Sequence, residues 1–143
     1  MPDIYHTVPV RGSAQRVFDM VSTPSGLDVW WTARSQGSPL LGTDYQLWFA
    51  PDYDWRARVT ACEAGTLFEL ELTTAMQDWL GTRVRFELAE RDGVTTLRFA
   101  HLEWPRDTAH LRESSYCWAM YLRHLKRHVE LGVTVPYEQR LDD

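Results

Sequence analysis

The stretch that decides the fold is SSYCWAMYLRHLKRHVELG, residues 114–132. It lies in a longer segment, 108–131, whose apolar residues recur with the period of an amphipathic helix. Gly132 follows as the expected C-cap residue, because glycine readily adopts the left-handed conformation that ends helices. This helix is the long amphipathic element available to cover a sheet. Its apolar face comprises Leu111, Trp118, Leu122, Leu125 and Val129.

Upstream of this helix, the apolar residues recur mostly with a period of two, which is typical of half-buried strands. A first strand is expected at 4–10. It is followed by a helix with Ser13 as N-cap and by a second short helix that ends at Trp31. The composition of SQGSPLLGTD (35–44) indicates a loop. Five further strands are expected at 44–50, 55–63, 66–74, 82–90 and 94–103.

The connections between successive strands are short, and RDG at 91–93 is typical of a hairpin turn. Short connections make neighbouring strands antiparallel. The sequence therefore predicts an α+β fold in which a curved six-stranded antiparallel sheet wraps around the C-terminal helix. The two short helices would lie between strands one and two, and residues 1–143 would form a single domain.

The chain has 143 residues, of which 44% are hydrophobic and 24% charged, as expected for a globular protein. A net charge of −5 argues against binding to nucleic acids or anionic membranes. Cys62 and Cys117 fit reduced thiols better than a disulfide framework. The N-terminus lacks the character of a signal peptide, and no apolar run is long enough to insert in a membrane. A cytoplasmic location is expected.

Five stretches together resemble the SRPBCC (START-like) superfamily, and more narrowly its bacterial, AHSA1-like branch, which is related to the C-terminal domain of the activator of Hsp90 ATPase. This resemblance implies a helix-grip fold with a cavity between the sheet and the long helix. Members of the superfamily use that cavity for apolar molecules, and some cyclise or hydrate polyketides. The five stretches are VFDMVSTPSGLDVWWT (17–32), GTDYQLWF (42–49), WLGTRVRFEL (79–88), TTLRFAHLEW (95–104) and SSYCWAMYLRHLKRHVELG (114–132).

Two ionisable residues occupy the apolar face of the last predicted strand. Alternation places His101 and Glu103 on the same side as Leu97 and Phe99. If they line a cavity, His101 could bond a ligand oxygen or act as acid or base, with Glu103 orienting it. Alternatively, His101 is a satisfied polar residue that fixes the C-terminal helix, and Glu103 lies beyond the rim.

The candidate ligand-binding residues are mostly aromatic, because ligand pockets are largely apolar with a few polar groups. The alternative is that these side chains simply fill the core. The candidates are Trp31, Phe86, Phe99, His101, Trp118 and Tyr121.

No metal site or cofactor is expected. His124 and His128 have a spacing that can hold a metal, but they lie among basic residues, and a solvated helix face explains them better. Cys117 has no evident base beside it, which argues against a nucleophilic thiol.

Large apolar residues are also expected on outer surfaces. Tyr116 and Met120 would lie on the outer side of the last helix, and Trp48 and Trp104 on the outer side of the sheet. Such clusters often mark partner surfaces, so a homodimer is expected as one possibility.

Three functions remain open from the sequence. The first is binding of an apolar or amphipathic small molecule. The second is an enzyme of polyketide-cyclase or hydratase type, with His101 as acid/base assisted by Glu103 and Tyr121. The third is a protein-interaction module related to Hsp90 co-chaperones.

Overall fold

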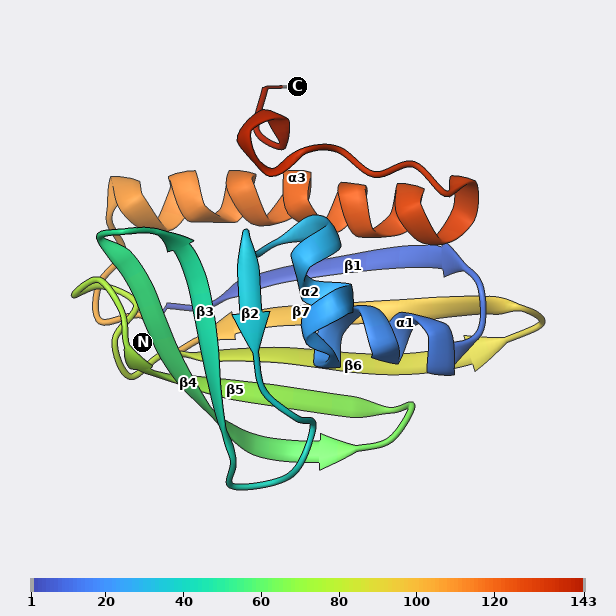
Figure 1. Cartoon of the computed structure of the whole chain (residues 1–143), viewed down its shortest axis with the longest axis horizontal. Coiled ribbons are helices and arrows are strands. Elements are labelled where there is room, and N and C mark those ends of the chain that lie inside the picture. Colours follow the sequence, from blue (N-terminus) through green and yellow to red (C-terminus); the bar gives the residue numbers. More distant parts are fainter. Residues whose placement is uncertain (1, 143) are drawn as a thin grey trace.

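The computed structural model describes residues 2–142 and contains one curved antiparallel sheet that holds a long helix (Figure 1). The sheet has seven strands in the order β1-β7-β6-β5-β4-β3-β2. The predicted α+β helix-grip architecture is confirmed. In chain order the elements are β1 (Ile4–Arg11), α1 (Ala14–Ser22), α2 (Pro24–Trp30), β2 (Arg34–Gln36), β3 (Asp44–Ala50), β4 (Tyr53–Glu63), β5 (Leu67–Thr74), β6 (Arg83–Arg91), β7 (Val94–Leu102) and α3 (Ala109–Leu131).

The sheet has one strand more than the six predicted. The additional strand, β2, lies at the sheet edge and pairs with β3, in a segment that the composition indicated to be a loop. Three polar residues, RSQ, show no alternation, so the pattern contains no strand signal. Contacts with the neighbouring strand stabilise β2. Arg34 lies opposite Trp48 on β3, and its guanidinium group stacks on the indole ring, 4.0 Å from the ring centroid.

Local signals in the sequence set the ends of the helices and the tightest turn. The Ser13 hydroxyl accepts a hydrogen bond from the Arg16 amide, and Gly132 ends α3 in the left-handed conformation, both as predicted. In the hairpin between β6 and β7, Asp92 and Gly93 both have positive φ, as a two-residue turn of the primed type requires.

Helix α3 covers the concave face of the sheet and runs along β1 (Figure 1). The chain then folds back over α3, ending in a short 3-10 helix at Tyr137–Gln139. This tail covers His124, whose Nε2 atom lies 2.5 Å from the carbonyl oxygen of Arg140. His124 is therefore buried, and the prediction that it lies on a solvated helix face is wrong. The apolar residues of α3 buried against the sheet are Trp118, Leu122, Leu125 and Val129.

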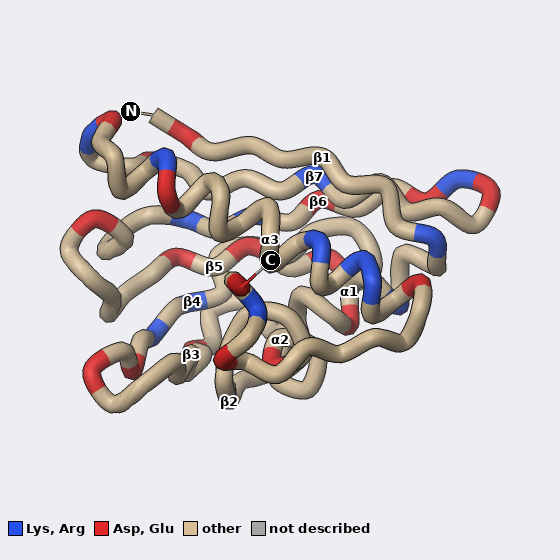
Figure 2. The backbone as a smooth tube through the Cα atoms, turned by 90° about the horizontal axis from the view of Figure 1, so that it is seen from above, with Lys and Arg blue, Asp and Glu red and all other residues tan. Residues whose placement is uncertain are grey.

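The predicted outer apolar surfaces are confirmed only in part. Tyr116 is exposed, whereas Trp104 is completely buried because it lies beyond the end of β7 and turns inward onto Trp79. Charged positions of both signs are interspersed along the chain (Figure 2). Within residues 2–142, no helix is both long and apolar enough to cross a membrane.

Candidate functional site

A cavity of about 190 Å³ lies between α3, the end of α2 and the strands β3 and β4. One side of it is aromatic and comes from the sheet, from α2 and from the β5–β6 loop. The other side comes from a single face of α3. The lining residues are Trp31, Phe49, Trp55 and Trp79 on the first side, and His110, Ser114, Cys117, Trp118 and Tyr121 on the second.

The aromatic side is a continuous set of packed rings. These rings pack against Trp118 of the α3 side, whose ring centroid lies 5.0 Å from that of Trp31 and 5.7 Å from that of Trp79. The rings of Trp79 and Trp118 are stacked, with an angle of 21° between their planes. Trp55 continues the wall, 5.1 Å from Trp79 and 4.9 Å from Phe49. Rings at these separations attract one another beyond simple area burial, so the wall is preorganised.

The α3 side adds a stripe of polar groups. His110, Ser114, Cys117 and Tyr121 are separated by four, three and four residues, which places them on one helix face. Burial raises the pKa of Tyr121 to about 12 and raises that of Cys117 as well. Both groups therefore stay neutral near pH 7, and Cys117 lacks the thiolate character of a nucleophile.

One member of this stripe forms a dyad with a carboxylate. The Nδ1 atom of His110 lies 2.9 Å from the Oδ2 atom of Asp78, which belongs to the β5–β6 loop. The two side chains are 34% and 26% exposed, so the dyad sits at the rim of the cavity. An ionised carboxylate only accepts hydrogen bonds, so Nδ1 is the donor.

His101 lies behind the cavity wall and does not line the cavity. The indole Nε1–H of Trp118 donates to Nδ1 of His101 at 3.1 Å, and an indole nitrogen can only donate. The proton of the neutral ring is therefore on Nε2, which donates to the Thr82 hydroxyl at 2.8 Å. Thr82 in turn donates to the carbonyl oxygen of Trp79.

This chain of hydrogen bonds leaves His101 without a free group for chemistry. The residue is fully buried, and burial lowers its pKa to about 3, so the ring stays neutral near pH 7. The geometry matches the alternative that His101 fixes the C-terminal helix: it holds Trp118, and thereby the cavity wall, in place.

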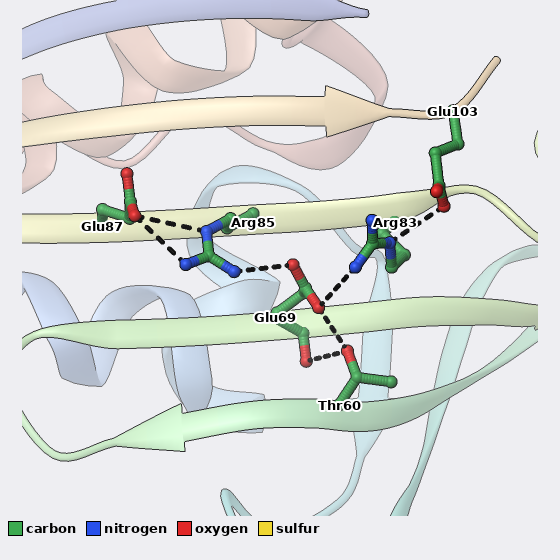
Figure 3. A network of polar contacts seen from close by, with 6 residues as sticks. All are labelled: Thr60, Glu69, Arg83, Arg85, Glu87 and Glu103. Atoms are coloured by element: carbon green, nitrogen blue, oxygen red, sulfur yellow. Dashed lines mark hydrogen bonds and ion pairs between the residues drawn. The ribbon is translucent and has the colours of Figure 1, made fainter. Parts of the chain in front are cut away.

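Glu103 lies on the outer face of the sheet and not on the inner face with His101. The prediction from strand alternation is therefore wrong for Glu103. Strand β7 ends at Leu102, and Glu103 has a φ of 69°, which breaks the period of two and turns its side chain to the outer face. There Glu103 accepts a hydrogen bond from Nε of Arg83 at 3.0 Å (Figure 3). This contact raises the pKa of Arg83. Glu103 therefore stands away from the cavity.

The same outer network contains a buried carboxylate. Glu69 is 3% exposed and accepts hydrogen bonds from Arg85 at 3.0 Å and from the Thr60 hydroxyl at 2.8 Å (Figure 3). Arg83 approaches it to 3.5 Å. These contacts link Glu69 to neighbouring strands on the outer face of the sheet, away from the cavity.

The structure brings together only part of the predicted ligand-binding set. Trp31, Trp118 and Tyr121 line the cavity, whereas Phe86 and Phe99 are core residues packed against each other at 5.5 Å. A signal existed for two of the residues that were missed, since His110 and Ser114 lie two turns and one turn before Trp118 on its own apolar face. The lining residues outside the predicted ligand-binding set are Phe49, Trp55, Trp79, His110, Ser114 and Cys117.

Comparison with solved structures shows the same fold in proteins from several sources. The solution structure of the Aha1 dimer from Colwellia psychrerythraea has a TM-score of 0.83 at 26% identity, covering 92% of this chain and 98% of that one. Protein SSP2350 from Staphylococcus saprophyticus gives 0.79 at 19% identity, with 94% and 96% covered. DynU16, a protein of the dynemicin biosynthetic locus, gives 0.76 at 17%, with 94% and 50% covered.

A search of curated proteins finds no match. The family model for Activator of Hsp90 ATPase homolog 1-like proteins matches residues 11–130, which include the strands β2 to β7 and all but the last residue of α3. The chain belongs to the Activator of Hsp90 ATPase homolog 1-like family.

Proposed function

We propose that the protein binds a small amphipathic molecule, of which a single substituted ring occupies the cavity beneath α3. The observation that carries this proposal is the cavity itself: four indole rings and one phenyl ring on its walls, with a polar stripe on one side. Apolar walls with a few convergent polar groups are the usual composition of a small-molecule site.

The volume limits the size of the ligand. A cavity of about 150 Å³ in another protein accepts benzene, whereas sites for drug-sized molecules start at about 300 Å³. The 190 Å³ found here lies near the lower of these values. A single ring with one or two substituents therefore fits inside, and the remainder of a larger ligand would lie outside the rim.

Of the three residues proposed for the enzyme alternative, only Tyr121 lines the cavity, and the proposed acid or base does not reach it. His101 is buried with both ring nitrogens bonded, and Glu103 lies on the other face of the sheet. A general acid or base must come within hydrogen-bond reach of the substrate. Binding of a small molecule is therefore the function that the geometry supports best.

A thermal-shift series combined with native mass spectrometry tests this proposal. Single-ring compounds at about 100 times their Kd should stabilise the fold by about 2.7 kcal/mol, which corresponds to roughly 5–10 °C in Tm for a chain of this size. Two-ring and longer apolar compounds should give no larger shift than matched single-ring compounds, because only one ring fits inside the cavity.

A cavity-filling variant gives the control. Ser114→Leu places extra carbons in the cavity and should abolish the shift, whereas Ala119→Leu, on the exposed side of the same helix, should retain it. Absence of any shift across single-ring compounds, or an equal shift in Ser114→Leu, would overturn the proposal.

Association of two copies is a second part of the proposal. The supporting observations are the similar structure described as a dimer and the exposed Tyr116 ring on α3, which is 63% accessible. Native mass spectrometry at micromolar concentration should show a dimer that Tyr116→Glu weakens. A monomer at every concentration would contradict this part.

A further inference from the structure

The dyad at the cavity rim leaves one hydrogen-bonding atom available to a ligand. His110 donates from Nδ1 to Asp78, so in the neutral ring Nε2 carries a lone pair and accepts. No partner for Nε2 is found among residues 2–142, and His110 is a lining residue of the cavity. The ring that carries this acceptor therefore lines the cavity, and its contact with Asp78 fixes its orientation.

The polar groups that follow His110 on α3 can donate hydrogen bonds. Ser114, one turn further along α3, and Tyr121 both carry hydroxyl groups that can donate. Burial keeps the Tyr121 hydroxyl protonated. The stripe thus offers one acceptor at the rim and donors deeper along the helix, and a ligand hydroxyl, which donates one hydrogen bond and accepts others, matches this set.

The charge of the cavity lining indicates whether the hydrogen-bond donor of the ligand is neutral or charged. No Asp or Glu is among the lining residues, and the Asp78 carboxylate is already engaged by His110. A ligand ammonium group would therefore lose its hydration without gaining a counter-charge, which costs far more than moving a neutral hydroxyl.

We infer that His110, oriented by Asp78, accepts a hydrogen bond from the ligand, and that the ligand class is a neutral aromatic ring bearing a hydroxyl group. This inference rests on the proposed function of the cavity. Phenol is the simplest probe of this class, and toluene has nearly the same shape without the hydroxyl donor.

The test is an NMR titration of the protein with each probe, which yields the Kd for phenol and for toluene. The informative quantity is the ratio of the two Kd values, because it cancels the contribution of the aromatic wall. His110→Phe keeps a ring at this position and removes the acceptor. In this variant the preference for phenol should fall by about three- to thirtyfold, the typical effect of one hydrogen bond, while the Kd for toluene stays within about twofold.

A matched control uses another histidine of the same helix. His128 contacts the Thr134 hydroxyl and does not line the cavity, so His128→Phe should leave both Kd values unchanged. An unchanged preference for phenol in His110→Phe, with toluene still bound, would overturn this inference and leave the proposed function standing. Tighter binding of benzylamine than of phenol would also overturn it. If neither phenol nor toluene binds the native protein, the proposed function itself fails.

Discussion

At the scale of the residue, the structure separates two side chains that the sequence pattern placed together. Alternation correctly predicted that His101 faces inward, because it lies within a regular strand paired on both sides. The same rule failed at Glu103, one residue past the strand end, where the positive φ reverses the side chain. Nothing in the pattern marks this change, since glutamate is not a residue that usually requires a positive φ.

His101 should make the stability of the fold depend on pH. Its pKa is about 3 in the folded chain, lowered by burial from an ordinary value of 6.5. Between these values the unfolded chain binds a proton that the folded chain does not. The free energy of unfolding should therefore fall as the pH is lowered from 6.5 towards 3, by up to about 1.4 kcal/mol per pH unit.

Urea unfolding at several pH values between about 4 and 7 isolates this contribution. His101→Gln should be less stable than the native chain near pH 7, because it disturbs the bonds to Thr82 and Trp118. Its stability should also fall less steeply on acidification, whereas the control His128→Gln, at a half-buried position of α3, should keep the native slope. A native slope in His101→Gln would show that His101 is not the group that binds the proton.

At the scale of the element, the sequence predicted most of the helices and strands and their types. It missed features that depend on close contact between elements. Six of the seven strands, the hairpin at 91–93, the N-cap at Ser13 and the C-cap at Gly132 followed from local chemistry, whereas β2 did not. The start of α2 did not follow in the same way, because a proline after a helical stretch is typical of a helix end. In the structure Pro24 is the first residue of α2, Thr23 caps it, and the two short helices meet at Gly26.

Gly26 should be intolerant of even one added carbon. A Cβ atom there would lie 2.3 Å from the Asp19 carbonyl oxygen, which is backbone and has no flexible side chain to displace. Gly26→Ala should therefore force α1 and α2 apart and lower the free energy of unfolding by about 1–3 kcal/mol. Chemical denaturation measures this change.

Ser25→Ala is the matched control, because Ser25 is exposed and directly precedes Gly26. It should change the stability by no more than about 0.5 kcal/mol. If Gly26→Ala is as stable as Ser25→Ala, the tight contact between the two helices does not exist in solution.

At the scale of the whole molecule, a C-terminal tail outside the matched family region ties the helices together. Arg140 is 4% exposed and donates to the carbonyl oxygens of Asp28 at 2.6 Å and Thr32 at 3.1 Å, at the end of α2. Its own carbonyl meets His124 on α3. Because Trp31 lies between Asp28 and Thr32 in sequence, the tail also holds one wall of the cavity.

Arg140→Met should test this connection. The variant removes a charged donor from buried carbonyl groups, which should destabilise the fold by at least about 2 kcal/mol and lower Tm by roughly 4–8 °C. Arg123→Met, on the exposed side of α3, should change Tm little. Equal Tm values for the two variants would mean that the tail contributes nothing.

The cavity was the part of the molecule that the sequence could predict least. Its α3 face follows from helical spacing around Trp118, but the position of Asp78 beside His110 joins residues 32 apart through a loop. The volume depends on how Trp55, Trp79 and Trp118 pack, and no periodicity encodes that packing.

The most direct test of the central claim is a crystal of the protein soaked with 4-bromophenol, whose bromine is located by anomalous scattering. We predict one bromophenol ring in the cavity, in contact with its aromatic lining and with its hydroxyl group directed to His110. Crystals of Ser114→Leu should contain no ring there. Bromine sites confined to the outer surface, with the cavity unchanged, would contradict the claim that this protein binds ligands beneath α3.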